Sequence, residues 1–309
     1  MNNKIVVLSG GVGGARFLEG LIQIIPQEKV FVIGNTGDDE EFYGLHVSPD
    51  LDIVLYTLSG VVNEKQGWGL QNETYNVMQQ LTNLGNNDWF KLGDKDLAVQ
   101  IHRTNLLKQG KKLSDITNEL VKEFGLKIKL VPMTDDSVKT VIKTINGPIP
   151  FQEYFVKNRW QDKVLDIIYS SAEKAKPAPG IIDTILSVEG IIIAPSNPLV
   201  SIDTILSISG IREALLKTKA KIIALSPIIA GETIKGPAVK MMKEIGIEAS
   251  AVGVAQHYRD FLDAMIIDTK DKELKGKIEK LGIKTVVTNT IMKNKEIKKE
   301  LAQIALNTL

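Results

Sequence analysis

Short runs rich in valine and isoleucine alternate along this chain with stretches of helical period, and no other feature constrains the fold as strongly. Residues 4–8 form the first apolar run, a glycine-rich stretch follows at 10–14, and an apolar stripe of helical spacing then extends over 17–25. A second apolar run occupies residues 30–33. Alternating strands and helices build a parallel sheet with crossover helices. We therefore predict an α/β fold, a Rossmann-like parallel sheet with helices on both faces.

The same unit returns in the second half of the chain, while the middle differs. Helical stretches at about 74–84 and 113–124 dominate the middle, followed by a β-like segment from 127 to 156. Prolines and a glycine in 176–180 interrupt any regular element there. We predict a core made of residues 1–60 and 180–309 and a mostly helical insertion at 61–179. The later apolar runs predict strands at 190–194, 221–225, 249–253, 264–268 and 284–288, with a closing helix at about 294–306.

The composition excludes several classes of protein. The chain has 38 Lys and Arg against 37 Asp and Glu, a formal charge of +1, so no overall field attracts nucleic acid or an anionic membrane. The longest apolar runs are about ten residues, far below the roughly 20 that a spanning helix needs. There is no cysteine, hence no disulfide and no thiolate site. The N-terminal residues lack a secretory signal pattern, so we expect a cytoplasmic protein without nucleic-acid or membrane partners.

Four glycines lie between the first predicted strand and the first predicted helix. Without side chains, they let backbone N–H groups approach an anion at the positive end of the helix dipole, an arrangement that suits phosphate. Their spacing matches neither the dinucleotide motif G-x-G-x-x-G nor a P-loop, so a tight turn without a ligand is the alternative. The residues are Gly10, Gly11, Gly13 and Gly14.

An acidic cluster follows the second predicted strand. No Lys or Arg occurs between positions 30 and 64, so the neighbouring sequence does not neutralise these acids. Mg²⁺ binds to one or two carboxylates and completes its shell with water and phosphate oxygens, and we predict that Asp38 and Asp50 bind it or the substrate. The alternative is a capped helix start, with Ser48 as N-cap and solvated acids. The cluster comprises Asp38, Asp39, Glu40, Glu41, Asp50 and Asp52.

Three further loops offer polar groups. Lys91 lies among aromatic residues, where a planar ligand could stack, although such aromatics also fill hydrophobic cores. Ser196 and Asn197 follow a predicted strand between two prolines, and they either cap the next helix or contact a nucleotide. Asn35 follows the second strand. Because ligands of open parallel sheets bind beyond the carboxyl ends of the strands, the loops at Asn35 and at Ser196 and Asn197 belong to the predicted cleft.

Eight short motifs occur in order across nearly the whole chain, and together they resemble a known family. They are S-G-G-V-G-G-A-R from Ser9, N-T-G-D-D from Asn35, S-P-D-L-D-I-V-L-Y from Ser48, G-W-G from Gly67, N-E-T from Asn72, K-L-G-D-K-D from Lys91, A-P-S-N-P from Ala194 and S-P-I-I from Ser226. The chain resembles the 2-phospho-L-lactate transferases of coenzyme F420 biosynthesis. That resemblance implies a Rossmann-like core with a largely helical insertion that covers the deazaflavin site, Mg²⁺ dependence and a homodimer.

The resemblance also implies a reaction. A phospholactyl or phosphoenolpyruvyl group moves from a guanosine diphosphate donor, lactyl- or enolpyruvyl-diphosphoguanosine, to the terminal ribityl hydroxyl of the deazaflavin Fo, and GMP is released. Asp38 and Asp50 match the metal and acceptor-hydroxyl positions, and Lys91 matches a deazaflavin contact. The donor would bind to Gly10, Gly11, Gly13, Gly14, Asn35, Ser196 and Asn197. Within the family the glycine loop and the residue at Arg16 vary, so the three-carbon group stays open.

Other classes remain as alternatives. Proteins with a similar core resemble non-catalytic regulators that bind nucleotide sugars. A metal-dependent glycosyltransferase also uses paired acids, and Asp50 and Asp52 alone do not exclude one. An NAD-dependent oxidoreductase is disfavoured, because Asn35 and Thr36 follow the second strand where an acidic ribose ligand is expected.

Overall fold

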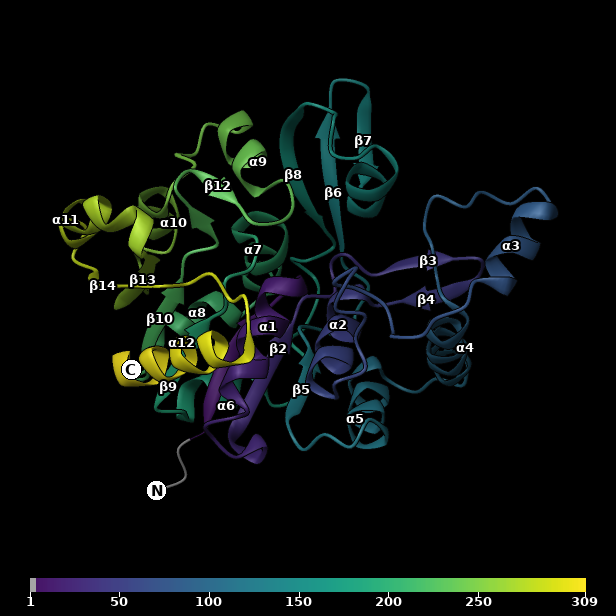
Figure 1. Cartoon of the computed structure of the whole chain (residues 1–309), viewed down its shortest axis with the longest axis horizontal. Coiled ribbons are helices and arrows are strands. Elements are labelled where there is room, and N and C mark those ends of the chain that lie inside the picture. The colour runs from purple at the N-terminus through teal and green to yellow at the C-terminus, as the bar shows by residue number, and fades with distance from the viewer. Residues whose placement is uncertain (1–3) are drawn as a thin grey trace.

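Seven parallel strands form one central sheet in the computed structural model, which describes residues 4–309 (Figure 1). The strand order is β14-β13-β10-β9-β1-β2-β5, and every neighbouring pair is parallel. The strands are β1 (Ile5–Ser9), β2 (Val30–Gly34), β5 (Lys129–Pro132), β9 (Gly190–Ile193), β10 (Lys221–Leu225), β13 (Ala264–Asp268) and β14 (Lys284–Thr288).

Helices cover both faces of this sheet, as predicted. Side chains alternate along β1, so that Ile5 and Val7 belong to one hydrophobic cluster and Val6 and Leu8 to the other. The first cluster is covered by α1 (Gly11–Leu21), α2 (Pro49–Leu58), α5 (Leu113–Glu123) and α12 (Lys295–Thr308). The second is covered by α6 (Ile181–Ser187), α7 (Asp203–Leu206), α8 (Ile211–Lys217), α9 (Ala238–Glu244), α10 (Ala251–His257) and α11 (Lys275–Glu279).

The connections change direction next to β1. From β1 the chain continues to β2 and β5 on one side, and it later returns to β9 and continues outward on the other side. In doubly wound sheets, ligands bind at such a switch point, beyond the carboxyl ends of the strands. Here the switch point lies between β1 and β9, so the loops after Ser9 and Ile193 form its walls.

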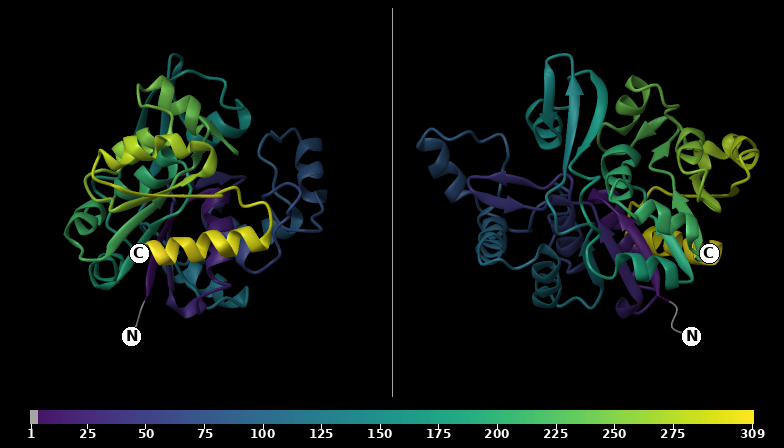
Figure 2. Two further views of the ribbon diagram at one scale, coloured as in Figure 1. Left: turned by 60° about the vertical axis from the view of Figure 1, so that its left-hand side comes forward. Right: turned by 180° about the vertical axis from the view of Figure 1, so that it is seen from behind.

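Segment 61–179 contributes to the core sheet as well as to separate elements. Its helices are α3 (Asn76–Asn83), α4 (Asp94–Lys108) and α5, while β6 (Lys139–Thr144), β7 (Gly147–Pro150) and β8 (Val164–Ser170) form an antiparallel sheet. However, β5 pairs with β2, so this segment is neither purely helical nor wholly outside the core. The small sheet projects from one end of the core, and α3 projects from the side together with the hairpin β3 (Glu40–Phe42) and β4 (Leu45–Val47) (Figure 2).

Two local predictions are wrong. Residues 249–253 are not a strand, because Ser250 accepts hydrogen bonds from the amides of Val252 and Gly253 and thereby caps α10. The glycine stretch is not a separate turn, because α1 begins at Gly11 and includes it. The remaining short elements are η1 (Gln27–Lys29), η2 (Glu153–Lys157), η3 (Pro198–Ile202), η4 (Thr269–Leu274), β11 (Ile228–Ile229) and β12 (Glu232–Thr233).

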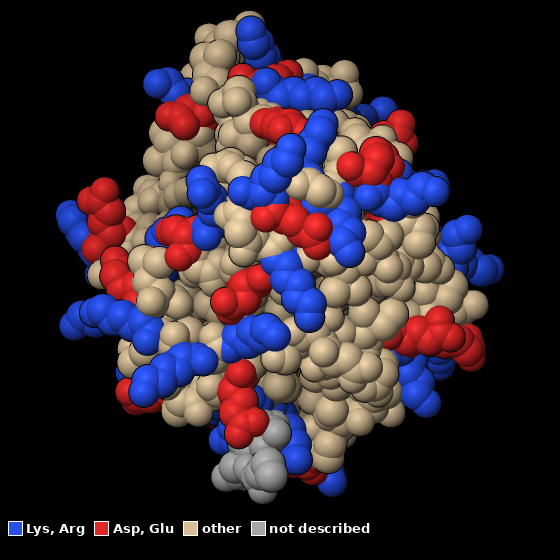
Figure 3. Space-filling view, turned by 90° about the vertical axis from the view of Figure 1, so that its left-hand side faces the viewer, with Lys and Arg blue, Asp and Glu red and all other residues tan. Residues whose placement is uncertain are grey.

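Charged side chains of both signs lie on the surface (Figure 3). On the face shown in Figure 3, Lys and Arg side chains are interspersed with Asp and Glu, and neither sign dominates. Within residues 4–309, no helix has both the length and the hydrophobicity needed to cross a bilayer.

Candidate active site

The glycines at the start of α1 pack tightly against the loop that follows β9. Ser196 Oγ accepts a hydrogen bond from the Gly10 amide at 3.0 Å and donates one to the Gly10 carbonyl at 2.6 Å. A Cβ atom on Gly13 would lie 2.1 Å from the Pro195 carbonyl oxygen, and one on Gly14 would lie 2.1 Å from Ser9 Oγ. The structure therefore brings the predicted glycines and Ser196 together, and it gives Gly13 and Gly14 a packing reason that spacing alone did not reveal.

Asn197 caps the next turn of helix, as one of the two predictions for this loop stated. Its side-chain oxygen accepts from the amides of Leu199 at 3.0 Å and Val200 at 3.4 Å. The segment then passes the glycine loop so closely that a Cβ on Gly10 would lie 2.5 Å from Ser201 Cβ. The loop after β9 is thus held rigidly beside the start of α1.

Asp50 lies in the first turn of α2 and faces the same glycines. A Cβ on Gly10 would lie 2.9 Å from Asp50 Oδ2, and one on Gly11 would lie 3.6 Å from Oδ1. Asn35 Nδ2 donates to Asp50 Oδ2 at 3.0 Å. Burial raises the pKa of Asp50 to about 6, although the Asn35 side chain and the Gly11 amide favour its charged form. The predicted acid therefore lies beside the predicted anion-binding helix end.

Asp38 lies in the turn after β2, close to Asp50. It is buried, and its Oδ1 atom has no hydrogen-bond partner within residues 4–309. Burial raises the pKa of Asp38 well above its usual value, and the nearby charge of Asp50 raises it further. Asn35 links the turn that carries Asp38 to Asp50, because its oxygen accepts from the Gly37 amide at 2.9 Å while its NH₂ group donates to Asp50.

The two carboxylates fit a divalent cation. Burial raises the pKa of both acids, the charge of Asp50 raises that of Asp38 further, and Asp38 has a free oxygen, so a cation between them would stabilise both carboxylates. Mg²⁺ needs only one or two carboxylates when water and phosphate oxygens complete its shell. Within the described chain no group of three or more His, Cys, Asp or Glu side chains could hold a metal, so a cation here would depend on such additional oxygens.

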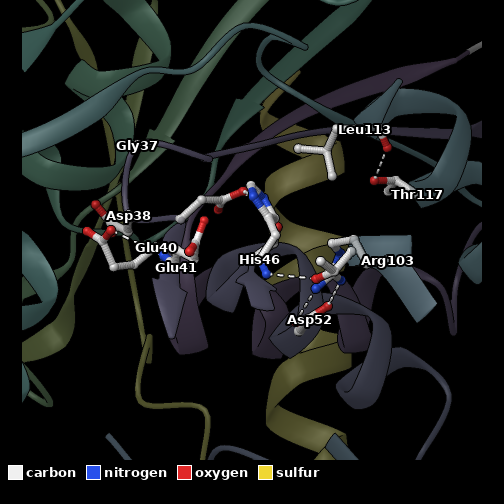
Figure 4. Close-up of polar contacts among 12 residues, drawn as sticks. Gly37, Asp38, Glu40, Glu41, His46, Asp52, Arg103, Leu113 and Thr117 are labelled. Carbon is white, nitrogen blue, oxygen red and sulfur yellow. Dashed lines mark hydrogen bonds and ion pairs between the residues drawn. The ribbon is translucent and has the colours of Figure 1, made fainter. Parts of the chain in front are cut away.

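Two other acids of the cluster, Asp52 and Glu40, are neutralised by distant segments. Arg103 of α4 forms a buried ion pair with Asp52, which lies apart from Asp38 (Figure 4). Lys139 of β6 pairs with Glu40 at 3.1 Å. The neighbouring sequence lacks cations, as noted, but the fold supplies them, and Asp52 is thereby occupied in joining α2 to α4.

Lys91 lies apart from the residues gathered around Asp38 and Asp50. It is exposed on the loop before α4, and no hydrogen bond joins it to Asp38 or Asp50. Phe90 stacks on Phe42 with ring centroids 3.8 Å apart, and Trp89 meets Phe42 edge-on at 5.3 Å. These aromatics pack into the small hydrophobic core of the projecting lobe, by which we mean α3, α4 and the β3–β4 hairpin. A core role was the alternative to ligand stacking. The role of Lys91 toward an acceptor stays a prediction.

Sequence reasoning missed the threonines around Asp38. The buried hydroxyls of Thr140 on β6 and Thr204 on α7 lie 3.3 Å apart, and the Thr140 hydroxyl favours the charged form of Asp38 by hydrogen bonding. The Thr140 amide donates to the Gly37 carbonyl at 2.7 Å. Nothing in the sequence indicates that β6, about a hundred residues later, packs on this turn.

Comparison with known proteins gives a consistent result. The family model described as 2-phospho-L-lactate transferase CofD matches residues 5–308. The chain is 43% identical to a phosphoenolpyruvate transferase of Streptomyces griseus, with 98% of this chain and 97% of that protein covered. It is 40% identical to a 2-phospho-L-lactate transferase of Methanocaldococcus jannaschii, with 97% and 96% covered. A solved UPF0052 protein from Bacillus halodurans shares the fold, with a TM-score of 0.67, 16% identity and 99% of both chains covered.

Proposed function

The chain belongs to the 2-phospho-L-lactate transferase CofD family, and from this premise we propose which group it transfers and to what. The donor is a guanosine diphosphate ester of lactate or enolpyruvate, and the acceptor is the terminal ribityl hydroxyl of the deazaflavin Fo. The products are coenzyme F420-0, or its dehydro form, and GMP. The observation that carries the proposal is the pair of buried acids, Asp38 and Asp50, beside the glycine-lined start of α1.

The reaction replaces one bond to phosphorus by another. The hydroxyl oxygen bonds to the β-phosphorus of the donor, the bond from that phosphorus to the bridging oxygen breaks, and GMP leaves with the electron pair. Such a displacement needs alignment and stabilisation of negative charge rather than a protein nucleophile. The positive end of α1, which begins at Gly11, suits the diphosphate, while Ser196, which accepts from the Gly10 amide, and Asn197 hold the neighbouring wall.

Asp50 is the residue we assign to the hydroxyl. Its pKa of about 6 leaves it largely ionised at neutral pH and still able to accept a proton. Asn35 fixes the orientation of the carboxylate through its hydrogen bond to Oδ2. Asp38 and Asp50 would together hold Mg²⁺, whose chemistry when bound is to neutralise charge on the diphosphate. We further propose that Lys91 contacts the deazaflavin and that the enzyme works in the cytoplasm as a homodimer.

The central test is Asp50→Asn. This substitution keeps the size and the hydrogen bond to Asn35 but removes the charge, and we expect kcat to fall by about 10²–10⁴-fold, the usual contribution of a positioned acid or base. Asp183→Asn is the matched control, because Asp183 also lies in the first turn of a helix but is exposed. Circular dichroism should show both variants folded. Normal turnover of Asp50→Asn would remove Asp50 from the mechanism.

Two further measurements identify the substrates. Mass spectrometry of the product formed from each donor separates the lactyl from the enolpyruvyl reaction, which the relatives do not decide, since both names occur among them. Mixing the purified protein with Fo tests the acceptor, because protein that binds Fo retains the fluorescence of the deazaflavin. Tight binding of a nucleotide sugar without binding of Fo would favour the non-catalytic alternative.

A further inference from the structure

Asp39 directly follows Asp38, and its Oδ1 atom likewise has no hydrogen-bond partner within residues 4–309, but its other oxygen is bound. Its Oδ2 atom accepts hydrogen bonds from Ser48 Oγ at 2.7 Å and from His46 Nε2 at 3.0 Å. The side chain is only 5% exposed. These contacts run from the turn after β2, which carries Asp38, to the residues just before α2, which carries Asp50.

Ser48 occupies the N-cap position of α2, as one of the two interpretations of this segment expected, but its side chain is used differently. Its side chain caps no amide of α2, although its backbone carbonyl accepts from the Asp52 amide at 3.0 Å. Its hydroxyl is directed instead to Asp39. Since Pro49 restricts the backbone between Ser48 and Asp50, fixing Ser48 also fixes the start of the helix on which Asp50 lies.

Asp39, His46 and Ser48 together are called the bracket below. Further contacts hold both of its ends. Lys139 Nζ donates to the Asp39 backbone carbonyl at 2.5 Å. The His46 amide donates to Thr104 Oγ1 at 2.8 Å, which ties the other end to α4. Because β6 and α4 are separate elements, the bracket is supported from two sides.

We propose that Asp39 is a positioning residue that sets the separation of Asp38 and Asp50. By binding Ser48 and His46, it holds the Asp38 turn against the start of α2, so that the two carboxylates converge on one cation. This inference rests on the proposed function, because it assumes that Asp38 and Asp50 bind Mg²⁺. Residues that orient metal ligands typically change metal affinity 10–100-fold when they are removed.

The test measures metal binding by the full-length protein without substrates. Mn²⁺ serves as the probe in place of Mg²⁺, and free Mn²⁺ is followed by electron paramagnetic resonance. Ser48→Ala leaves all carboxylates in place and removes one donor to Asp39, and we expect its Kd for Mn²⁺ to rise at least about tenfold. Ser48→Thr keeps the hydroxyl and should stay within about threefold of the wild type. Asp39→Asn, which removes the charge, should weaken binding in the same direction.

Ser114→Ala is the matched control. Ser114 Oγ donates to Asp135 Oδ2 at 2.9 Å, the same kind of pair at the start of another helix, without contact to Asp38 or Asp50. Its Kd should equal that of the wild type. Equal Mn²⁺ affinity of Ser48→Ala and the wild type would overturn the positioning role and leave the proposed function standing. Absence of Mn²⁺ binding to the wild type would overturn the positioning role together with the assignment of Asp38 and Asp50 as metal ligands, whereas the transfer itself is tested by product formation.

Discussion

At the scale of single residues, two glycines at the start of α1 are required for different physical reasons. Gly11 has a φ of +61°, a left-handed conformation that favours glycine. Gly13 lacks this conformation, and its constraint is the Pro195 carbonyl, 2.1 Å from where a Cβ atom would lie. Packing of α1 on the loop after β9 therefore requires Gly13 whether or not it touches phosphate.

Gly13→Ala should destabilise the protein. The added methyl group meets backbone atoms that cannot rotate away, and overpacking of this kind costs about 1–3 kcal/mol. Gly276→Ala is the control, because Gly276 is also helical but a Cβ there meets nothing within 4 Å. That change should be neutral or stabilise by up to about 1 kcal/mol. Urea denaturation of both variants measures the difference, and equal stability would refute the packing argument.

At the scale of elements, α2 presents acids to two sides. Asp50 faces α1 and the site, whereas Asp52 faces α4 and pairs with Arg103, which is 1% exposed. Gln100 Nε2 donates to Asp52 at 3.0 Å and to Asp96 at 2.7 Å, and the Tyr56 hydroxyl donates to Asp96 at 2.7 Å. This buried network joins the projecting lobe to the core.

Arg103→Met should be strongly destabilising. Removing one partner leaves the Asp52 carboxylate buried without its cation, which costs about 3–5 kcal/mol. The control is Arg212→Met, because Arg212 and Asp260 form an ion pair that is about 40% exposed and such pairs contribute about 0–1 kcal/mol. Denaturant midpoints of the two variants give the comparison. A small effect of Arg103→Met would mean that the pair does not hold α2 to α4.

The raised pKa of Asp96 leads us to predict a specific pH dependence of the free energy of unfolding. Burial, and secondarily the charge of Asp52, raises its pKa from an ordinary value of 3.8 to about 6 in the folded protein. The folded state therefore holds this proton more tightly than the unfolded state, so its stabilising contribution is complete below about pH 4 and is lost as pH rises through 6. Asp96→Asn keeps an oxygen to accept from Tyr56 and Gln100 but cannot ionise.

The wild type should accordingly lose stability relative to Asp96→Asn between about pH 4.5 and 7, with a constant difference at higher pH. Urea denaturation of both proteins at several pH values measures this difference. Other titrating acids are common to both proteins and largely cancel. Parallel stability curves over the whole range would contradict the raised pKa of Asp96.

At the scale of the whole molecule, distant parts of the chain pack against one another. Helix α12 packs on α1, and Leu301 is buried there at 1% exposure. Segment 61–179 is attached through β5 in the core sheet, through Arg103 and through Thr140. We therefore expect core and insertion to unfold together.

Leu301→Ala tests this expectation. The cavity should cost about 2–5 kcal/mol, whereas Gln303→Ala on the exposed side of the same helix should cost little. All three tryptophans lie within 61–179, so their fluorescence reports on the insertion while circular dichroism reports on the whole chain. Both signals should shift by the same amount. A fluorescence transition that stays in place would show that the insertion unfolds on its own.

The sequence predicted the features that are local or periodic. Runs of valine and isoleucine predicted the strands at 221–225, 264–268 and 284–288, because a buried parallel strand needs apolar side chains on both faces. The loop after a strand located Ser196, because parallel strands end at one edge of the sheet. A run of acids without neighbouring cations located Asp38 and Asp50. The strand predicted at 249–253 failed, because a short run of small residues fits both structures and Ser250 caps a helix.

The tertiary structure decided what depends on contacts between distant segments. It determined that Arg103 neutralises Asp52, that Thr140 adjoins Asp38 and that Asp39 binds Ser48 rather than standing free in an acidic cluster. Hydrogen bonds and ion pairs act over a few ångströms, and which groups come that close follows from how the whole chain packs. A linear pattern could therefore name the acids of this site, but only the folded chain divided them between the cleft and the framework around it.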